Sequence, residues 1–457
     1  MTELSSSPPA HTHSQYQLMR ERRFAPFFWT LFLGAVNDNI FKVGFTSLLT
    51  FQAAQFGNVD PGSAAFIISA IFILPFVLFS ATSGQIADKY DKATLTRLVK
   101  IFEIGIMLLG AGGYLLHDVT ILYVCTFLMG THSTLFGPVK YAYLPQHLRD
   151  DELVGGNGIV ESGTFIAILL GTIAGGEAAS FGSHGALVLS LGCVGAAVLG
   201  RVCASHVPPS PSDQPDLAIN WNPLTETWRN LALARVDRTL FVGLLGISWL
   251  WFVGATLLTS FFSFAKDVLF ADAGVVTLLL ATFSVGIGVG SLLCERLSGR
   301  RVELGLVPLG AIGMSVFAAD LYLASRHSPA SGHLLGFVAF LGNGMHWRVL
   351  IDLLLLSVSG GIYSVPLYAL IQSRSKPTHR ARMIAANNIL NSLFMIVSSL
   401  MALALTAIHF TIPELYLTTA VLNVVVTTAL FVAVPEFLSR FRTWIRGALS
   451  KKNTGTP

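Results

Sequence analysis

Long apolar segments recur along almost the whole of this chain. Apolar residues make up 53% of its 457 residues and charged residues only 12%, whereas an ordinary soluble domain has about 25% charged residues. A helix that crosses a membrane needs roughly 20 mainly apolar residues. We therefore expect an all-α, multi-pass membrane protein. The predicted spans lie at about 25–53, 62–86, 95–116, 119–141, 153–180, 184–206, 239–264, 270–295, 301–323, 349–372, 383–409 and 413–435.

The positive charges are shared unevenly between the gaps that separate these spans. Of the 29 Lys and Arg residues, 23 lie in the tails and in alternate gaps, although the formal net charge is only +4. Cytoplasmic loops of membrane proteins carry such an excess of Lys and Arg. The pattern predicts an even number of spans with both termini in the cytoplasm. It also excludes a basic nucleic-acid-binding surface, which would gather its charges on one face.

The cysteines and the first residues exclude two other classes of protein. Cys125, Cys193, Cys203 and Cys294 are scattered through or beside apolar spans, without metal-binding spacing. We expect free thiols, no metal site and no cofactor. Residues 1–19 are polar and lack the basic-then-apolar order of a signal peptide. The first span is therefore expected to direct insertion.

A short pattern occurs twice, each time between two spans. The first copy covers residues 84–92 and a looser copy covers 290–301. A glycine at the end of a span lets another helix approach closely, and Asp88 is placed to face the positive end of a helix or a nearby Arg or Lys. Lys89 and Lys92 are expected to anchor the loop at the anionic inner leaflet. A basic loop that serves topology alone is the alternative.

This duplicated pattern resembles the loop that marks the major facilitator transporters. In that superfamily, twelve spans form two parallel six-helix bundles, and the loop latches the halves together on the cytoplasmic side. The resemblance implies the same fold and the same role here. The residues expected to form the latch are Gly84, Asp88, Lys89, Lys92, Glu295, Arg296 and Arg300.

A Pro- and Ser-rich break after the sixth span divides the chain. Its composition predicts a flexible, partly extended linker. A short amphipathic helix is expected to begin at Asn222–Pro223, with an irregular polar loop as the alternative. The expected domains are an N-terminal tail (1–23), a first six-helix bundle (24–206), the linker with its helix (207–238), a second six-helix bundle (239–435) and a basic tail (436–457).

Glycines in the fifth and eighth spans have the spacing of helix–helix contacts in membranes. Because these spans meet across the halves in the superfamily, we expect the glycines to form that contact. They are Gly171, Gly175 and Gly176 in the fifth span and Gly286, Gly288 and Gly290 in the eighth.

A few charged residues lie inside the predicted spans, where a charge costs about 2.5–3.5 kcal/mol on insertion scales. Asp38 and Lys42 share one helical face, either as a self-neutralising pair or as a site on a cavity wall. Lys140 is either a snorkelling anchor or part of that site. Glu161 has the uncharged Asn391 as its counterpart in the second half, which favours an asymmetric site. The expected substrate-binding residues are Asp38, Asn39, Lys42, Lys140, Tyr141, Asn157 and Glu161.

Several of these residues carry a closer resemblance, to the lysophospholipid transporter family, over about residues 24–435. The similar segments are Asn37–Asn39, Pro138–Tyr141, Asn157–Glu161, Trp221–Asn222 and Pro366–Gln372. Two runs, Phe24–Lys42 and Ser291–Gly299, are most similar to a branch in which the transporter is fused to a glycerolipid acyltransferase. One departure is Leu258, which lies about where stand-alone members tend to carry an Arg.

The resemblance implies a transporter and not an enzyme. The family moves lysophospholipids, chiefly lysophosphatidylethanolamine and lysophosphatidylglycerol, from the outer to the inner leaflet of the bacterial inner membrane. An acyltransferase then restores the second chain. Because the sequence has no His-x4-Asp acyltransferase motif, we expect a separate glycerolipid acyltransferase as a partner. The other expected partners are the lysophospholipid substrate and membrane lipids, and the protein is expected to be a monomer.

Two other functions fit the residues. A proton-coupled exporter of an amphipathic drug or small solute would use Asp38 or Glu161 as its proton carrier. A scaffold for an acyltransferase would move no lipid, but it would not need charges inside its spans.

Overall fold

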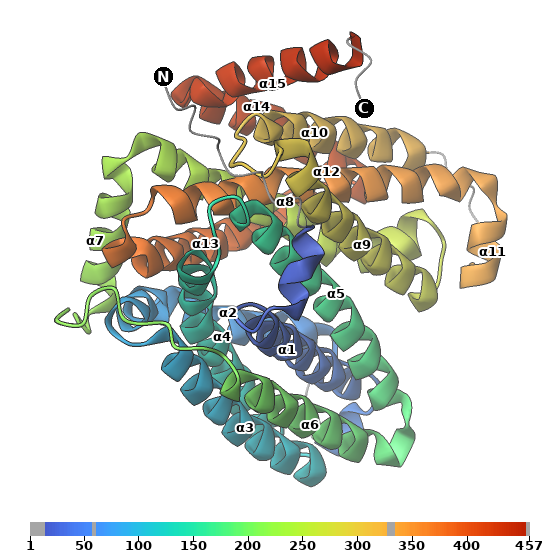
Figure 1. The fold of residues 1–457 in the computed structure, drawn as a ribbon. Coiled ribbons are helices and arrows are strands. Elements are labelled where there is room, and N and C mark those ends of the chain that lie inside the picture. Colours follow the sequence, from blue (N-terminus) through green and yellow to red (C-terminus); the bar gives the residue numbers. More distant parts are fainter. Residues whose placement is uncertain (1–13, 57–60, 327–333, 454–457) are drawn as a thin grey trace, which may run out of the picture.

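The computed structural model describes residues 14–56, 61–326 and 334–453, and these are almost entirely helical (Figure 1). In the first half, the helices are α1 (Ala25–Phe51), α2 (Pro61–Lys89), α3 (Lys92–Leu116), α4 (Val119–His147), α5 (Leu153–Ser180) and α6 (Gly185–Ser205). In the second half they are α8 (Arg238–Ser263), α9 (Ala273–Ser298), α10 (Leu306–Ser325), α12 (Gly344–Arg374), α13 (Arg380–Ala407) and α14 (Ile412–Ala433). The remaining elements are η1 (Gln15–Arg20), α7 (Pro223–Val236), α11 (Phe337–Gly342) and α15 (Glu436–Asn453).

The long helices match the predicted spans. Eleven of them are long and apolar enough to cross a membrane. The one remaining predicted span, the first, is α1, whose 27 residues are long enough. Asn37, Asp38, Asn39 and Lys42 interrupt its apolar stretch. The polar cluster that singles out α1 in the sequence is therefore also what lowers its hydropathy.

The two halves repeat the same packing. In the first half α1 packs on α5, α2 on α4 and α3 on α6; in the second, α8 packs on α13, α9 on α12 and α10 on α14. Each pair of the first half has its sequence-equivalent pair in the second. The halves meet where α2 contacts α13 and α5 contacts α9, and Figure 1 shows them as a blue-to-green and a yellow-to-red bundle. The predicted fold of two parallel six-helix bundles is confirmed.

The segment between the halves is ordered, so the predicted flexible linker is wrong. Residues 206–222 lie on the first half, where Lys92 Nζ is 2.8 Å from Asp213 Oδ2 and the Ser210 N–H donates to Asp91 Oδ2 over 2.7 Å. Asn220 N–H donates to Gln85 Oε1 (2.8 Å), and Gln85 Nε2 donates back to the Asn220 carbonyl (3.0 Å). A Pro-rich composition predicts an extended backbone. It does not predict whether neighbouring helices offer hydrogen-bond donors and acceptors that hold this backbone in place.

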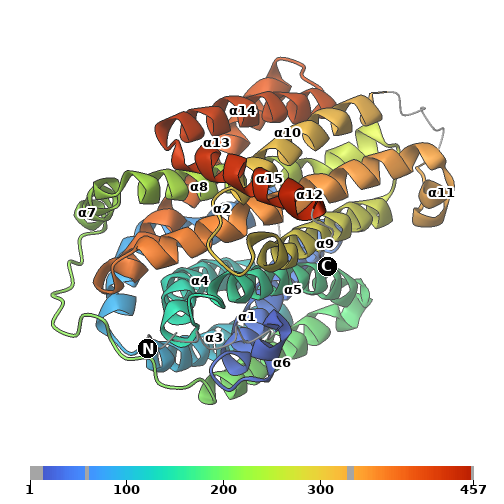
Figure 2. The same ribbon diagram turned by 45° about the horizontal axis from the view of Figure 1, so that its top comes forward.

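Two short amphipathic helices complete the end of the bundle that carries this linker. Helix α7 begins where expected, with Asn222 accepting from the Leu224 and Thr225 N–H groups, and it presents Trp228 outward. Figure 2 shows α15 lying across the second half, where the Trp444 indole donates to the Leu297 carbonyl (2.8 Å). We call this end of the molecule, with Asp88, Glu295 and residues 206–222, the linker face.

Most of the glycines expected between the halves pack within one half instead. A Cβ on Gly171 would lie 2.4 Å from the Val36 carbonyl oxygen, and one on Gly290 would lie 2.0 Å from that of Val358. Gly175 and Gly286 likewise face α1 and α12, and a Cβ on Gly176 would meet no atom of another element within 4 Å. Of the expected glycines, Gly288 faces the other half, where a Cβ on it would lie 2.9 Å from Ser162 Oγ. The spacing indicates a close helix contact, but not which neighbouring helix makes it.

Candidate substrate site and the contacts between the halves

Asp88 joins the end of α2 to the start of α13. Its side chain has no exposed surface; Oδ1 accepts from the Ala381 N–H and Oδ2 from Arg382 Nε, both over 3.0 Å. The carboxylate therefore meets both the positive end of a helix and a guanidinium. Gly84 permits the approach, because a Cβ there would lie 2.9 Å from the Arg382 Cα.

Arg382 is the partner that the sequence reading did not identify. In the sequence it is one of several basic residues in the gap before the eleventh predicted span, yet it is 1% exposed. Besides Asp88, its Nη2 donates to Gln214 Oε1 of the linker (2.8 Å) and to the Thr378 carbonyl (3.0 Å). One guanidinium thus connects the first half, the linker and the second half. Its place directly before the eleventh predicted span, which the structure shows to be the first turn of α13, was the available signal.

The two lysines of the first loop differ in their surroundings. Lys89 is partly exposed, with Nζ 5.8 Å from the Tyr90 ring centroid. Lys92 is fully buried by the linker and pairs with Asp213. The expectation that Lys92 anchors the loop at lipid head groups is therefore wrong. The physical reason is that the linker supplies the anion that the lipid was expected to supply.

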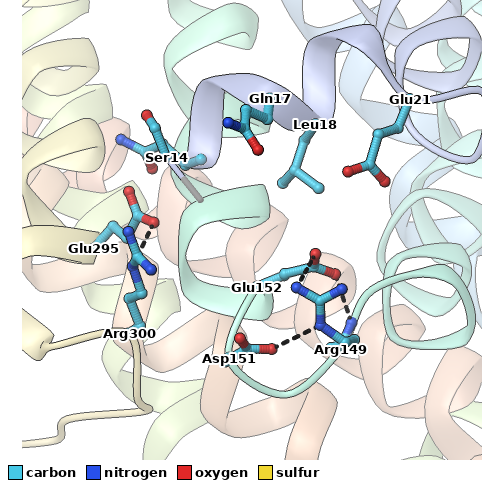
Figure 3. Close-up of a pocket in the computed structure, with 10 residues that line it drawn as sticks. Ser14, Gln17, Leu18, Glu21, Arg149, Asp151, Glu152, Glu295 and Arg300 are labelled. Atoms are coloured by element: carbon cyan, nitrogen blue, oxygen red, sulfur yellow. Dashed lines mark hydrogen bonds and ion pairs between the residues drawn. The ribbon is translucent and has the colours of Figure 1, made fainter. Parts of the chain in front are cut away.

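The second copy of the loop is built differently from the first. Figure 3 shows Glu295 paired with Arg300 of its own half, beside Ser14 at the start of η1, at 3.3 Å. The Glu295 carboxyl carbon lies only 3.4 Å from where a Cβ on Gly155 would stand, in the first turn of α5. Gln15 lies at the same seam and donates from Nε2 to the Leu292 carbonyl (3.1 Å). Arg296 is exposed.

The start of α5 is held by charges of the first half. Glu152 pairs with Arg23 (2.7 Å) and with Arg149 (2.8 Å). Burial raises the pKa of Glu152, but the hydrogen bonds from Arg23 and from the Arg149 backbone outweigh it and bring the pKa below its usual range.

Asn157, expected among the substrate-binding residues, connects the two halves in this conformation. Its Nδ2 donates to Gln372 Oε1 (2.5 Å), and Gln372 Nε2 donates back to Asn157 Oδ1 (3.1 Å). Both residues are fully buried. The pair occupies the amide groups of both side chains, so in this conformation Asn157 does not offer its amide to a solute.

Lys140, Tyr141 and Glu161 come together where four helices of both halves meet. Lys140 Nζ lies 3.6 Å from Glu161 Oε1 and donates to Thr164 Oγ1 over 3.2 Å. The Tyr141 hydroxyl donates to Glu161. Across the halves, the Tyr141 ring stacks on Tyr368 with centroids 4.5 Å apart. The cluster therefore combines a cation, a carboxylate and aromatic faces.

The second half adds another aromatic side chain to this cluster. The Trp251 indole of α8 donates to the Tyr368 hydroxyl over 3.3 Å. Nearer the face opposite the linker, Phe165 of α5 and Phe283 of α9 form an edge-to-face pair across the halves, with centroids 6.2 Å apart. An apolar region thus follows the polar one along α5.

Asp38, Asn39 and Lys42 form a separate group within the first half. Asp38 Oδ2 accepts from Ser133 Oγ (2.7 Å), and Asn39 donates to the Ala35 carbonyl (2.8 Å). Lys42 Nζ lies 4.0 Å from the centroid of the Phe72 ring, a cation–π contact. In the described part of the chain, no ion pair within 4.0 Å joins Asp38 to Lys42. The two residues therefore do not form the self-neutralising pair that was one of the two expectations.

Comparison with known proteins assigns this arrangement to a family. The chain matches the Major Facilitator Superfamily over residues 27–351. It is 30% identical over 385 residues to the lysophospholipid transporter LplT of Enterobacter sp. (strain 638), covering 82% of this chain and 87% of that protein. The LplT of Klebsiella pneumoniae (strain ATCC 700721 / MGH 78578) is 31% identical over 314 residues, which is 68% of this chain and 71% of that one.

The chain belongs to the lysophospholipid transporter family of the Major Facilitator Superfamily. It is a multi-pass membrane protein with a transporter fold, as its sequence predicts. Solved structures agree: the human organic anion transporter MFSD10 has a TM-score of 0.67 at 13% identity, covering 90% of this chain and 99% of that one. The E. coli fucose:proton symporter FucP gives 0.65 at 16%, covering 90% and 98%. At such identities the likeness shows the fold alone.

This family member also contains a buried charge network that the sequence reading missed. Glu103 of α3 pairs with Lys100, lies 3.3 Å from His132 Nε2 and accepts from Asn37 Nδ2 (2.7 Å). These four side chains are at most 2% exposed. In the sequence, Lys100 and Glu103 lie near the start of the third predicted span with the i, i+3 spacing that is also typical of an exposed ion pair, and their burial was not predicted.

Removing the Glu103 carboxylate is expected to destabilise the first half. Glu103→Ala leaves the Lys100 ammonium buried without its anion, a change that costs about 3 kcal/mol or more at buried pairs. The temperature at which half of the purified protein leaves the monodisperse peak of a size-exclusion column should fall clearly. Asp118→Ala, which removes only the cap of α4, is the matched control and should have a smaller effect. An unchanged midpoint for Glu103→Ala would contradict the assigned pairing.

Proposed function

We propose that this chain moves lysophospholipids from the outer to the inner leaflet of the bacterial inner membrane, with the linker face in the cytoplasm. The observation that carries the proposal is its 30% identity to a lysophospholipid transporter over 87% of that protein's length. The excess of Lys and Arg in the gaps at the linker face supports the orientation.

The cluster around Lys140 suits the head group of such a substrate. A phosphate takes charge-assisted hydrogen bonds from an ammonium group, and the ammonium of an ethanolamine takes a carboxylate partner. Lys140 and Glu161 now face each other at 3.6 Å, so a zwitterionic head group between them replaces one ion pair by two. The acyl chain then runs past Phe165 and Phe283 toward the opposite face.

The observed contacts support entry of the substrate from the face opposite the linker. Asp88 with Arg382, Asn157 with Gln372 and Tyr141 with Tyr368 all join the halves at or near the linker face. Release into the inner leaflet requires these contacts to part. In this proposal, Asp88 and Arg382 act as the latch, and a separate acyltransferase then uses the product.

Transport by the purified protein tests the proposal directly. Proteoliposomes that contain the full chain should move labelled lysophosphatidylethanolamine to the other leaflet faster than they move the two-chain lipid, and faster than protein-free liposomes do. The same assay with and without a proton gradient distinguishes this function from that of a proton-coupled exporter. Such an exporter would show gradient-dependent transport of another solute and no lysolipid turnover. The absence of lysolipid movement would overturn the proposal and favour the scaffold.

A further inference from the structure

The linker face contains a cavity apart from the cluster around Lys140. It has a volume of about 560 Å³, within the range of small-molecule pockets. Gln15 and Tyr16 of η1 form one side, and Val289, Leu293, Glu295 and Arg296 of α9 form the other, with Arg300 beside them. Figure 3 shows the adjoining region, in which Glu295 and Arg300 lie next to η1. None of the expected substrate-binding residues lines this cavity.

The exposed face of α9 changes from apolar to cationic along the helix, and it runs from Val285, outside the cavity lining, through Val289 to Arg296. Val285 and Val289 are 47% and 43% exposed, Leu293 is partly exposed and Arg296 is exposed. Since these residues follow one another at steps of three or four, they form one stripe on the helix. The stripe is apolar in the spanning part of α9 and positively charged where α9 reaches the linker face.

The charges of the cavity favour a phosphate. Arg300 is paired with Glu295, whereas Arg296 has no ion pair within 4.0 Å in the ranges that the structure describes. An exposed guanidinium binds phosphate oxygens with two parallel hydrogen bonds. Tyr16, at 59% exposure, stands at the rim, where aromatic side chains with a polar end lie at membrane surfaces.

We propose that this cavity binds a membrane phospholipid by its phosphate group. Arg296 holds the phosphate, and the first part of an acyl chain lies along Val289 and Val285. Because Gln15 of η1 lies between α5 and α9 at the same place, a bound lipid also fixes η1 on the seam between the halves. The proposal does not depend on which solute the protein transports.

Photolabelling of the full chain tests the site. The probe is a phosphatidylglycerol with a diazirine near the start of one acyl chain, added to the purified protein, and labelled residues are located by mass spectrometry. We expect labels between residues 285 and 293. Arg296→Ala should reduce them about fivefold, the effect of one cation near a membrane surface, and Arg296→Lys should keep most of them. Arg301→Ala, an exposed arginine outside the cavity, is the matched control.

Two further arms identify the source of the phosphate and guard against misfolding. A diacylglycerol probe with the same diazirine but no phosphate should label residues 285–293 several-fold less, and excess soluble glycerol phosphate should compete poorly, because it lacks the acyl chain. Each variant must also elute as the parent protein does on size exclusion. Equal labelling of the Arg296→Ala and Arg301→Ala proteins, or equal labelling by both probes, would overturn the proposal.

Discussion

Arg382→Ala should open the linker face. Asp88 has no exposed surface, and the substitution leaves its carboxylate buried without a cation. Breaking a buried pair in this way costs about 3–5 kcal/mol, and that cost applies to the closed arrangement alone. The balance between closed and open forms should therefore shift by roughly a hundredfold or more. Ser291→Cys reports the change, since Ser291 is fully buried in the seam between α5 and α9. Its rate of labelling by a water-soluble maleimide should rise accordingly.

Two matched variants decide whether the orphaned charge is the cause. Adding Asp88→Asn to Arg382→Ala removes that charge and should restore slow labelling of the cysteine. Arg374→Ala removes another arginine near the same face, one whose partner, Glu436, lies at the start of α15, which packs on the second half, and should leave the labelling rate unchanged. If Arg382→Ala labels as slowly as the parent, or if Asp88→Asn gives no rescue, Asp88 and Arg382 are not the latch.

Lys140→Ala should reduce the transport of every lysophospholipid, whereas Glu161→Gln should mainly reduce the transport of lysophosphatidylethanolamine. Every such substrate has a phosphate for Lys140 to bind, but only an amine-bearing head group needs the Glu161 carboxylate. A hydrogen bond to a charged group is worth about 1.5–3 kcal/mol, which corresponds to roughly a tenfold to hundredfold loss. Uptake of lysophosphatidylethanolamine and lysophosphatidylglycerol is measured side by side in proteoliposomes. The ratio of the two uptake rates in each variant tests the prediction.

The controls separate binding from packing. Lys140→Arg keeps the charge beside Glu161 and should retain part of the activity. Lys42→Ala tests the separate group formed by Asp38, Asn39 and Lys42, because Lys42 contacts Phe72 and not Glu161. If Glu161→Gln lowers the transport of both lipids equally, the carboxylate only holds Tyr141 and Lys140 in place. If the Asp38→Ala and Lys140→Ala proteins both transport lysophospholipids at the rate of the parent protein, the assigned substrate site is wrong.

Much of the fold could be predicted because it depends on patterns that a sequence displays directly. Apolar length sets the spans, and alternation of Lys and Arg sets their topology. The surroundings of Asp88 were within reach for the same reason, since an acid at the end of a span needs a cation or a helix start. The identity of the arginine that pairs with Asp88 could not be predicted, because Arg382 is 294 residues away in the chain.

Other features depend on which surfaces meet, and a sequence does not display that. Asn157 has the same polar side chain whether it faces a substrate or Gln372. The glycines of α5 and α9 mark close contacts, but the neighbouring helix is chosen by the packing of the whole bundle. Lys100 and Glu103 have the spacing of a surface pair, and only the placement of α1, α4 and α6 around them buries the pair.

The docked linker limits how far the two halves can separate at one corner of the molecule. Gln214 is hydrogen-bonded to the Asp88 carbonyl, and Asn220 is bonded both to Gln85 and to Thr225 of α7. As long as the bonds between Gln85 and Asn220 hold, no length of chain is free between the first half and α7. Once they part, residues 215–219 become a tether that reaches at most roughly 20 Å when fully extended. The hydrogen bonds of the Gln85 amide therefore determine whether residues 215–219 can extend and let α7 move away from the first half.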